Sequence, residues 1–406
     1  MAEAGENLIH DWNSVARQGR PAPQVTFFDE TLRDGIQNPS VCDPKIEDKL
    51  ELLHLMDELG IQYVDVGLPG AGRRAAEDVA RLVRETADGK MRIRPAVACR
   101  TVVADIAPAV DVAQKTGVSI EVMAFIGSSP IRQYAEEWTV DLIAKRSADA
   151  IDFAVKNGLP CCFVTEDTTR SSPDQLEVLF KNAIDHGAHR LCLCDTVGHA
   201  TPEGARALVL WTRDLVSRLG AKVGIDWHGH NDRGLGVVNT MAAAEAGADR
   251  VHGCALGIGE RVGNAAMELL LLNFRLDGGI DQDLTKLVHY CEVASRAVRF
   301  PIPVSYPLVG RDAFRTATGV HAAAIVKAEA KGEAWLADRV YSGVPAGLFG
   351  RGQEIEIGHM SGASNVTYWL KKRKIEATPE RIEKILAHAK QSDHVLTEEE
   401  VFALLR

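Results

Sequence analysis

Short apolar runs alternate with longer amphipathic stretches from residue 24 onward. The short runs have β-prone compositions, and several are apolar on both faces, which is typical of strands covered by helices. Helical patterns separate these runs, and one more follows the last. We therefore predict eight strands, at residues 24–29, 62–67, 92–98, 119–125, 161–166, 189–194, 222–227 and 250–254.

The repeated unit of strand, helix and glycine-marked return predicts parallel strands joined by right-handed crossovers. Eight such units favour an α/β fold with a closed (β/α)8 TIM barrel over residues 24–279. An open, doubly wound sheet is the structural alternative. Asp43 and Pro44 are expected to start the helix after the first strand, and Gly60 to end it.

The alternation ends near residue 277, and the remaining chain has a different pattern. A helical stretch at 283–298 precedes a proline-rich crossing, and another begins at His321. Two final helices are predicted from their start signals, one at Thr378-Pro379 and the other at the pair Thr397 and Glu400. We predict a smaller, mainly helical C-terminal appended region at 280–406, and an N-terminal extension at 1–23.

Composition excludes several classes of protein. A chain that is 46% hydrophobic and 25% charged is globular rather than disordered. The net charge of −10 argues against nucleic acid or an anionic membrane as a partner. No apolar run approaches the ~18 residues that span a bilayer. The N-terminus has no signal-peptide pattern. The eight cysteines have neither disulfide density nor zinc spacing, so we expect reduced thiols in a cytoplasmic protein.

Polar residues gather where the predicted strands end, the face of a TIM barrel that holds active sites. His228 and His230 share one face of their strand because residues i and i+2 project the same way. With Asp34 they form a two-histidine, one-carboxylate set for a divalent ion, to which Asn264 adds an amide oxygen directly or through water. Mg, Mn and Zn all suit these donors.

Arg33 lies next to Asp34 in the sequence, and its permanent positive charge could stabilise a developing enolate or alkoxide oxygen. The alternative is that Arg33 only forms a structural salt bridge. Asp65 and Glu166 are expected to orient Arg33 or move protons, or else to be structural carboxylates. Thr196 is a candidate to bind a substrate carboxylate; the alternative is a helix N-cap or a turn residue. The glycines between strand 8 and Asn264 lack dinucleotide spacing and predict a loop of close backbone approach.

The polar segments resemble a known family. In chain order they are FDETLRDGIQ, VDVGLP, FVTEDTTR, LCDTVG, HGHND and GIGERVGN. This set resembles the metal-dependent TIM-barrel synthases and lyases that act on 2-oxo acids and acyl-CoA. That group includes 2-isopropylmalate, homocitrate and citramalate synthases and hydroxymethylglutaryl-CoA lyase. The resemblance covers residues 24–370, and it is specific for the group rather than for one member.

The resemblance implies a role for each matching residue. Asp34, His228 and His230 match metal ligands, and Asn264 matches a direct or water-mediated one. The expected catalytic residues are Arg33, Glu166, His321 in TGVHAAAIVK and Tyr341 in VYSGVP. The expected substrate contacts are Gln37, Asp65, Met123, Cys162 and Thr196. Asp65 stands where the family usually has glutamate. The family further implies acetyl-CoA as co-substrate, and a homodimer in which His321 acts across the interface.

The appended region favours a synthase over a lyase, because hydroxymethylglutaryl-CoA lyases usually lack the part with His321 and Tyr341. The lyases' G-C-P loop is also absent, since Ala255 follows Cys254. We therefore expect a Claisen-type condensation of acetyl-CoA with a 2-oxo acid, with His321 or Glu166 as base. No leucine-sensing C-terminal domain is expected.

Cys162 stands where homocitrate synthases have an arginine for the distal carboxylate, so an apolar acceptor is favoured. The expected order of acceptors is 2-oxoisovalerate (giving 2-isopropylmalate, in leucine biosynthesis), then pyruvate, then 2-oxoglutarate. A lyase, a metal-assisted hydrolase and an inactive paralogue acting as a scaffold are the alternatives.

Overall fold

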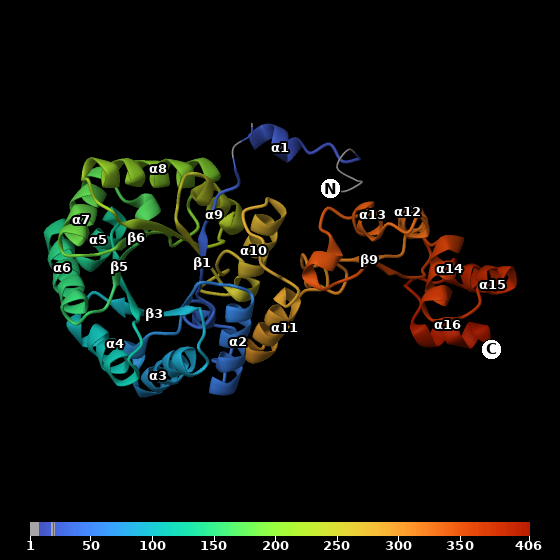
Figure 1. The fold of residues 1–406 in the computed structure, drawn as a ribbon, viewed down its shortest axis with the longest axis horizontal. Coiled ribbons are helices and arrows are strands. Elements are labelled where there is room, and N and C mark those ends of the chain that lie inside the picture. The colour runs from blue at the N-terminus through green and yellow to red at the C-terminus, as the bar shows by residue number, and fades with distance from the viewer. Residues whose placement is uncertain (1–7, 18, 20) are drawn as a thin grey trace. The chain divides into compact units, whose positions relative to one another are not determined.

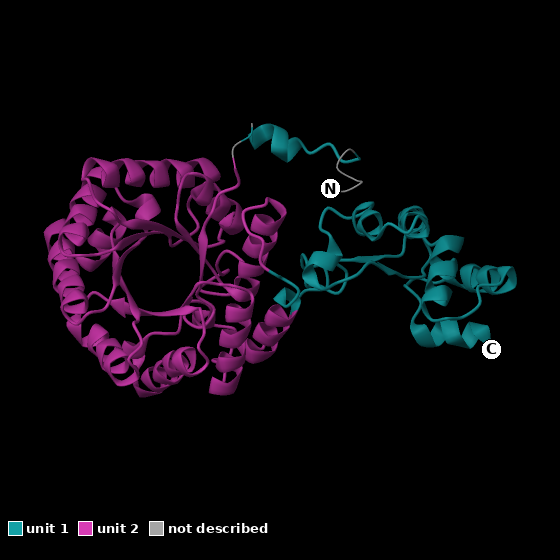
Figure 2. Cartoon of the chain, in the orientation of Figure 1, with its two compact units in different colours: residues 1–20, 283–288, 302–406 teal, residues 21–282, 289–301 magenta. Residues whose placement is uncertain are grey.

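The computed structural model describes residues 8–17, 19 and 21–406, and the chain forms two compact units, coloured separately in Figure 2. Unit 2 comprises residues 21–282 and 289–301. Unit 1 comprises residues 283–288, residues 302–406 and the described part of 1–20. Residues 289–301, which the sequence-based division assigns to the appended region, therefore group with the barrel. The extension predicted at 1–23 lies partly outside the described residues.

Unit 2 is a closed barrel of eight parallel strands paired in chain order, in which β8 closes on β1. Figure 1 shows its helices forming a ring outside the strands. The predicted TIM barrel is confirmed, and the open sheet is excluded. The strands are β1 (Thr26–Asp29), β2 (Tyr63–Asp65), β3 (Arg94–Arg100), β4 (Glu121–Gly127), β5 (Cys161–Glu166), β6 (Arg190–Asp195), β7 (Gly224–Gly229) and β8 (Arg250–Gly253).

The helices of unit 2 carry the chain back to the start of the next strand and bury their apolar faces against the barrel. They are α2 (Ile46–Glu58), α3 (Arg73–Asp88), α4 (Val103–Thr116), α5 (Pro130–Glu136), α6 (Val140–Lys156), α7 (Pro173–Asp185), α8 (Pro202–Arg218), α9 (Gly236–Glu245) and α10 (Met267–Leu276). Helix α11 (Leu287–Val298) begins in unit 1 and continues into unit 2.

The predicted start of α2 is wrong by two residues. The helix begins at Ile46, with extended Lys45 before it, rather than at Asp43-Pro44. The Asp43 carboxylate instead binds two cations, Lys49 Nζ at 2.8 Å and Arg74 Nη2 at 2.7 Å. A carboxylate held by two cations is not available to cap helix N–H groups. The predicted stop is confirmed: Gly60 follows the helix with φ of +73°, a backbone conformation that favours glycine.

The barrel register decides which side chains meet inside it. Cys194 on β6 lies opposite His228 on β7, and Phe28 on β1 lies opposite His252 on β8. Because alternate residues of a strand face the barrel interior, each strand sends a column of side chains inward. The strand ends thus form one rim, on which the polar segments of distant sequence origin come together.

Unit 1 has its own core. Two short parallel strands, β9 (Arg315–Thr316) and β10 (Glu354–Ile355), accompany its helices. An apolar cluster that includes Trp369, Leu370, Ile385 and Val401 joins the last three helices. Its helices are α1 (Trp12–Arg17), α12 (Gly319–Ala330), α13 (Ala334–Arg339), α14 (Ala363–Lys372), α15 (Pro379–Ala389) and α16 (Glu398–Leu405).

The two predicted starts of the final helices are confirmed. The Thr378 hydroxyl caps α15, and Thr397 with Glu400 forms the capping box of α16. All eight cysteines are free thiols, and only Cys42 is exposed. Within the described ranges, no helix combines the length and the apolar character needed to cross a bilayer.

Candidate active site

A pocket of about 390 Å³ opens at the carboxyl ends of the barrel strands, and unit 2 alone forms it. Acidic, basic and imidazole side chains of distant sequence origin meet there around an apolar floor. Nine residues predicted from the sequence line this pocket: Arg33, Asp34, Gln37, Asp65, Met123, Glu166, Thr196, His228 and His230. The barrel therefore gathers most of the predicted catalytic and binding side chains into one cavity.

Asp34, His228 and His230 form a compact, buried set of metal donors. Oδ2 of Asp34 lies 3.8 Å from Nε2 of His228 and 3.8 Å from Nε2 of His230. Nδ1 of His228 donates to Oε1 of Glu30 at 3.0 Å, because a carboxylate oxygen can only accept. That bond leaves the lone pair of Nε2 directed toward Asp34, as a metal ligand requires.

Burial sets the charge of these donors. Desolvation lowers the pKa of His228 to about 3 and that of His230 to about 4. Although burial opposes it, the neighbouring Arg33 and the two imidazoles hold the pKa of Asp34 well below its usual range. At neutral pH the set is one carboxylate and two neutral imidazoles, which is the form that binds divalent cations.

Asn264 completes the set from the loop after β8. Its Nδ2 donates to Oδ1 of Asp34 at 2.7 Å, while its buried Oδ1 has no hydrogen-bond partner among the described residues. Nδ1 of His230 is also buried and has no hydrogen-bond partner among the described residues. An oxygen without a partner beside three converging donors fits a bound cation, so these residues fit the metal that the sequence predicts.

The glycines of this loop permit the close approach that the sequence predicts. A Cβ atom at Gly263 would lie 1.8 Å from the carbonyl oxygen of Gly257, so only glycine fits there. The loop thereby folds back tightly enough to place Asn264 against Asp34.

Arg33 spans the acidic wall of the pocket. Its Nε donates to Oδ2 of Asp65 at 3.1 Å and its Nη1 to Oδ2 of Asp34 at 3.0 Å, and Nη2 contacts Glu30. The predicted pairing of Asp65 with Arg33 is therefore present in the structure. Burial nevertheless raises the pKa of Asp65 to about 6. The Arg33 side chain is 19% exposed, and it lines the cavity.

Thr196 and Glu166 lie on the opposite wall. Thr196 Oγ1 accepts from the backbone N–H of Asp167 at 2.8 Å, and Thr201, not Thr196, caps α8. Thr196 is therefore not a helix N-cap, but it does lie in the turn that follows β6. Glu166 Oε2 lies 3.8 Å from Nη2 of Arg132. Burial raises the pKa of Glu166 above the ordinary glutamate value.

Three of the predicted catalytic and substrate-binding residues do not line this pocket. Cys162 is buried beneath it, with Sγ 3.9 Å from Oδ2 of Asp226, and does not line it. His321 and Tyr341 belong to unit 1, where their rings stack with centroids 3.7 Å apart and planes 20° from parallel. The structure thus brings this pair together within unit 1, whereas the other catalytic candidates meet in unit 2.

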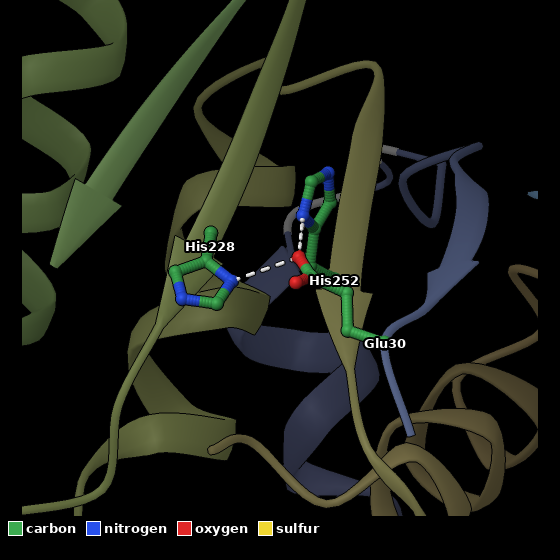
Figure 3. Close-up of side chains that lie close together, drawn as sticks. All are labelled: Glu30, His228 and His252. Atoms are coloured by element: carbon green, nitrogen blue, oxygen red, sulfur yellow. Dashed lines mark hydrogen bonds and ion pairs between the residues drawn. The ribbon is translucent and has the colours of Figure 1, made fainter. Parts of the chain in front are cut away.

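Sequence reasoning assigned no role to Glu30 or His252, which meet His228 in the pocket. Figure 3 shows the Glu30 carboxylate between the two imidazole rings. Below them, Asp226 binds Arg190 and Arg250, and Arg250 binds Glu121. The two-residue spacing of Arg250 and His252, and of Asp226 and His228, was the available signal that these side chains face inward.

The chain is similar to known proteins in sequence and in fold. The family model described as HMGL-like matches residues 24–295. Homocitrate synthase AksA of Methanopyrus kandleri is 30% identical over 90% of this chain and 87% of its own length. A 2-isopropylmalate synthase of Methanocaldococcus jannaschii is 32% identical over 87% of this chain and 64% of its own length. The HMG-CoA lyase structure from Bacillus subtilis superimposes with a TM-score of 0.58 at 21% identity, covering 70% of this chain and 97% of that one.

Proposed function

The chain belongs to the HMGL-like family, and on that premise we propose that it condenses acetyl-CoA with a 2-oxo acid. The acceptor we propose is 2-oxoisovalerate, which gives 2-isopropylmalate. One observation carries the proposal: the donors Asp34, His228 and His230 converge beside Arg33 in one pocket at the carboxyl rim of the barrel.

Asp34, His228 and His230, with Asn264, would hold the divalent ion, for which Mg, Mn and Zn are all suited. Such an ion supplies Lewis-acid polarisation of the acceptor ketone. Arg33, whose positive charge lines the same pocket, stabilises negative charge on the acceptor oxygen. Thr196 receives an N–H from Asp167, so its own hydroxyl hydrogen is available to the acceptor carboxylate.

Glu166 is the base that we propose within unit 2. Its raised pKa makes the carboxylate more basic than an ordinary glutamate, which suits proton abstraction from the acetyl methyl group. The C–H proton passes to the carboxylate, the enolate carbon bonds to the ketone carbon, and water then cleaves the thioester to release the CoA thiol. His321, stacked on Tyr341 in unit 1, is the second candidate for this base.

The pocket floor supports an apolar acceptor. It is formed by Ala98, Met123, Val164, Cys192 and Cys194, none of which is charged. Each of the pocket's three arginines already faces a carboxylate: Arg261 holds Asp232 through two nitrogens at 2.8 and 2.9 Å, Arg33 holds Asp34 and Asp65, and Arg132 lies 3.8 Å from Glu166. A second carboxylate, as in 2-oxoglutarate, would therefore lie against uncharged side chains. Pyruvate is the second candidate because its methyl group also suits the floor.

The test is release of the CoA thiol from acetyl-CoA by purified protein, with one 2-oxo acid and one metal ion at a time. We expect the highest kcat/KM with 2-oxoisovalerate. A preference for 2-oxoglutarate would contradict the apolar floor, and no release with any acceptor would contradict condensation. Sedimentation analysis tests the homodimer that we propose with it, and fractionation of source cells tests the cytoplasmic location.

A further inference from the structure

We propose that His252 is a positioning residue that holds the Glu30 carboxylate against His228 and so fixes the metal-binding face of His228. The inference rests on the metal site of the proposed function, but not on which acyl acceptor is used. It assigns a role to a buried histidine that the condensation itself does not use.

A single oxygen atom joins the two rings. Oε1 of Glu30 accepts from Nδ1 of His228 at 3.0 Å and from Nδ1 of His252 at 2.5 Å. The three side chains come from neighbouring places on the barrel, His228 on β7, His252 on β8 and Glu30 just after β1 (Figure 3). All three are buried, with 8% or less of each residue exposed.

Glu30 needs this second contact because a competing cation is close. Its other carboxylate oxygen contacts Nη2 of Arg33. Without His252, the attraction of the guanidinium would draw the carboxylate away from His228. Nδ1 of His228 would then lose its acceptor, and the ring could turn about its Cβ–Cγ bond away from the orientation that aims Nε2 at Asp34.

His252 is itself held on three sides. Its Nε2 lies 3.1 Å from Oδ2 of Asp226. Asp226 in turn accepts hydrogen bonds from Nε of Arg190 at 2.6 Å and from Nε of Arg250 at 2.7 Å. The ring of Phe28 stacks on the His252 ring, with centroids 4.4 Å apart and planes 20° from parallel.

These contacts connect the metal donors to the charged layer in the lower part of the barrel. The path runs from His228 through Glu30 and His252 to Asp226 and its two arginines. Carboxylates that receive the second N–H of a metal-binding histidine typically change metal affinity by roughly 10- to 100-fold when removed. We expect a loss of that size when the contact from His252 to Glu30 is lost.

Two substitutions of one residue separate its two contacts. In His252→Asn the amide nitrogen takes the place of Nδ1 and keeps the bond to Glu30. In His252→Gln the amide nitrogen takes the place of Nε2 and keeps only the contact with Asp226. Zn²⁺ affinity is measured by competition with a chelating dye, and the site geometry by the visible spectrum of bound Co²⁺, without acetyl-CoA or a 2-oxo acid.

We expect His252→Asn to bind Zn²⁺ within about 3-fold of the wild type, and His252→Gln to bind roughly 10- to 100-fold more weakly with an altered Co²⁺ spectrum. The reverse order would mean that His252 serves only to neutralise Asp226 and would overturn the proposal, as would equal affinity in both. His186→Gln, which removes the Nδ1 contact with Asp152 on the outer helices, is the histidine control and should leave both readouts unchanged.

A second comparison guards against a variant that fails to fold. Glu30→Ala should lose affinity to the same extent as His252→Gln, and the double variant should bind no worse than Glu30→Ala alone. Additive losses would overturn the proposal. A wild-type protein that binds Zn²⁺ but releases no CoA thiol would contradict the condensation while leaving this test intact.

Discussion

The backbone of Gly259 passes so close to Asn264 that a Cβ atom built on it would lie 2.1 Å from Nδ2 of the asparagine. The same Cβ would lie 2.8 Å from Oδ1 of Asp34. We therefore predict that Gly259→Ala displaces Asn264 and Asp34 and weakens Zn²⁺ binding by at least ~10-fold, the lower bound for a disturbed ligand shell. Dye competition measures the affinity.

Gly72→Ala is the matched control for this substitution. Gly72 has φ of +146°, close to the +148° of Gly259, but open space where its Cβ would be. Both variants carry the strain of a positive φ, but only Gly259→Ala adds a steric clash, so Gly72→Ala should lose less thermal stability and keep the Zn²⁺ affinity of the wild type. Equal Zn²⁺ affinity in the two variants would show that Gly259 does not shape the metal site.

Removal of one metal ligand should abolish metal-dependent activity without unfolding the barrel. Asp34→Asn keeps the shape of the side chain but removes the only carboxylate of the donor set. We expect Zn²⁺ affinity to fall by more than the ~100-fold that outer contacts contribute. Dialysis of the wild type against a chelator should also abolish CoA release, and a divalent ion should restore it. Activity that survives chelation would contradict a metal-dependent mechanism.

Arg33 should affect turnover more than metal binding. Lysine at this position keeps the charge but cannot contact Asp65 and the reacting oxygen through one planar group. We predict that Arg33→Lys lowers kcat by roughly 100- to 1,000-fold. Zn²⁺ affinity should change by less than 10-fold in a parallel titration. An equal loss in both measurements would mean that Arg33 only supports the metal ligands.

The pH dependence of kcat/KM should report Glu166. A base works only when it is deprotonated, and burial raises the pKa of this carboxyl. The value of kcat/KM should therefore rise with pH, with a midpoint above the ordinary pKa of glutamate. Activity should be lost at pH values below that midpoint, where Glu166 is protonated. Glu166→Gln should remove this rise and lower the rate by about 100- to 10,000-fold. A rise that persists in this variant would assign it to another group and favour His321 as the base.

Met123 should limit the size of the acceptor side chain. It is buried on the pocket floor, so Met123→Ala would enlarge the space beneath the metal donors. We predict at least a ~10-fold shift in relative kcat/KM toward 2-oxo acids with longer apolar side chains. Met56→Ala is the control, because Met56 is fully buried in α2 away from this pocket. It should lower stability and leave acceptor preference unchanged.

The barrel could be predicted because its signals are local. Each strand was marked by its own apolar run, and β5, expected at 161–166, has those bounds in the structure. The pairing of His228 with His230 followed from the two-residue period of one strand. Asp43 was misjudged because its partners Lys49 and Arg74 are decided by packing, which helix-start preferences do not contain.

The partners of His228 could not be predicted for the same reason. Glu30 and His252 are separated by 222 residues and meet only because β8 closes on β1. Spacing shows that His252 faces inward, but not which carboxylate it will contact. For Cys162 the sequence predicts the direction of the side chain but not its depth. It faces the barrel interior, yet it is fully buried and does not line the pocket.

The fate of the acetyl carbons tests the proposed condensation most directly. Metal-loaded protein is incubated with acetyl-CoA labelled with ¹³C at the methyl group and with unlabelled 2-oxoisovalerate, and the products are followed by NMR. We predict that the label appears as a methylene carbon next to a tertiary alcohol carbon, as in 2-isopropylmalate. Label recovered only as free acetate would mean thioester hydrolysis without carbon–carbon bond formation, and would contradict the central claim.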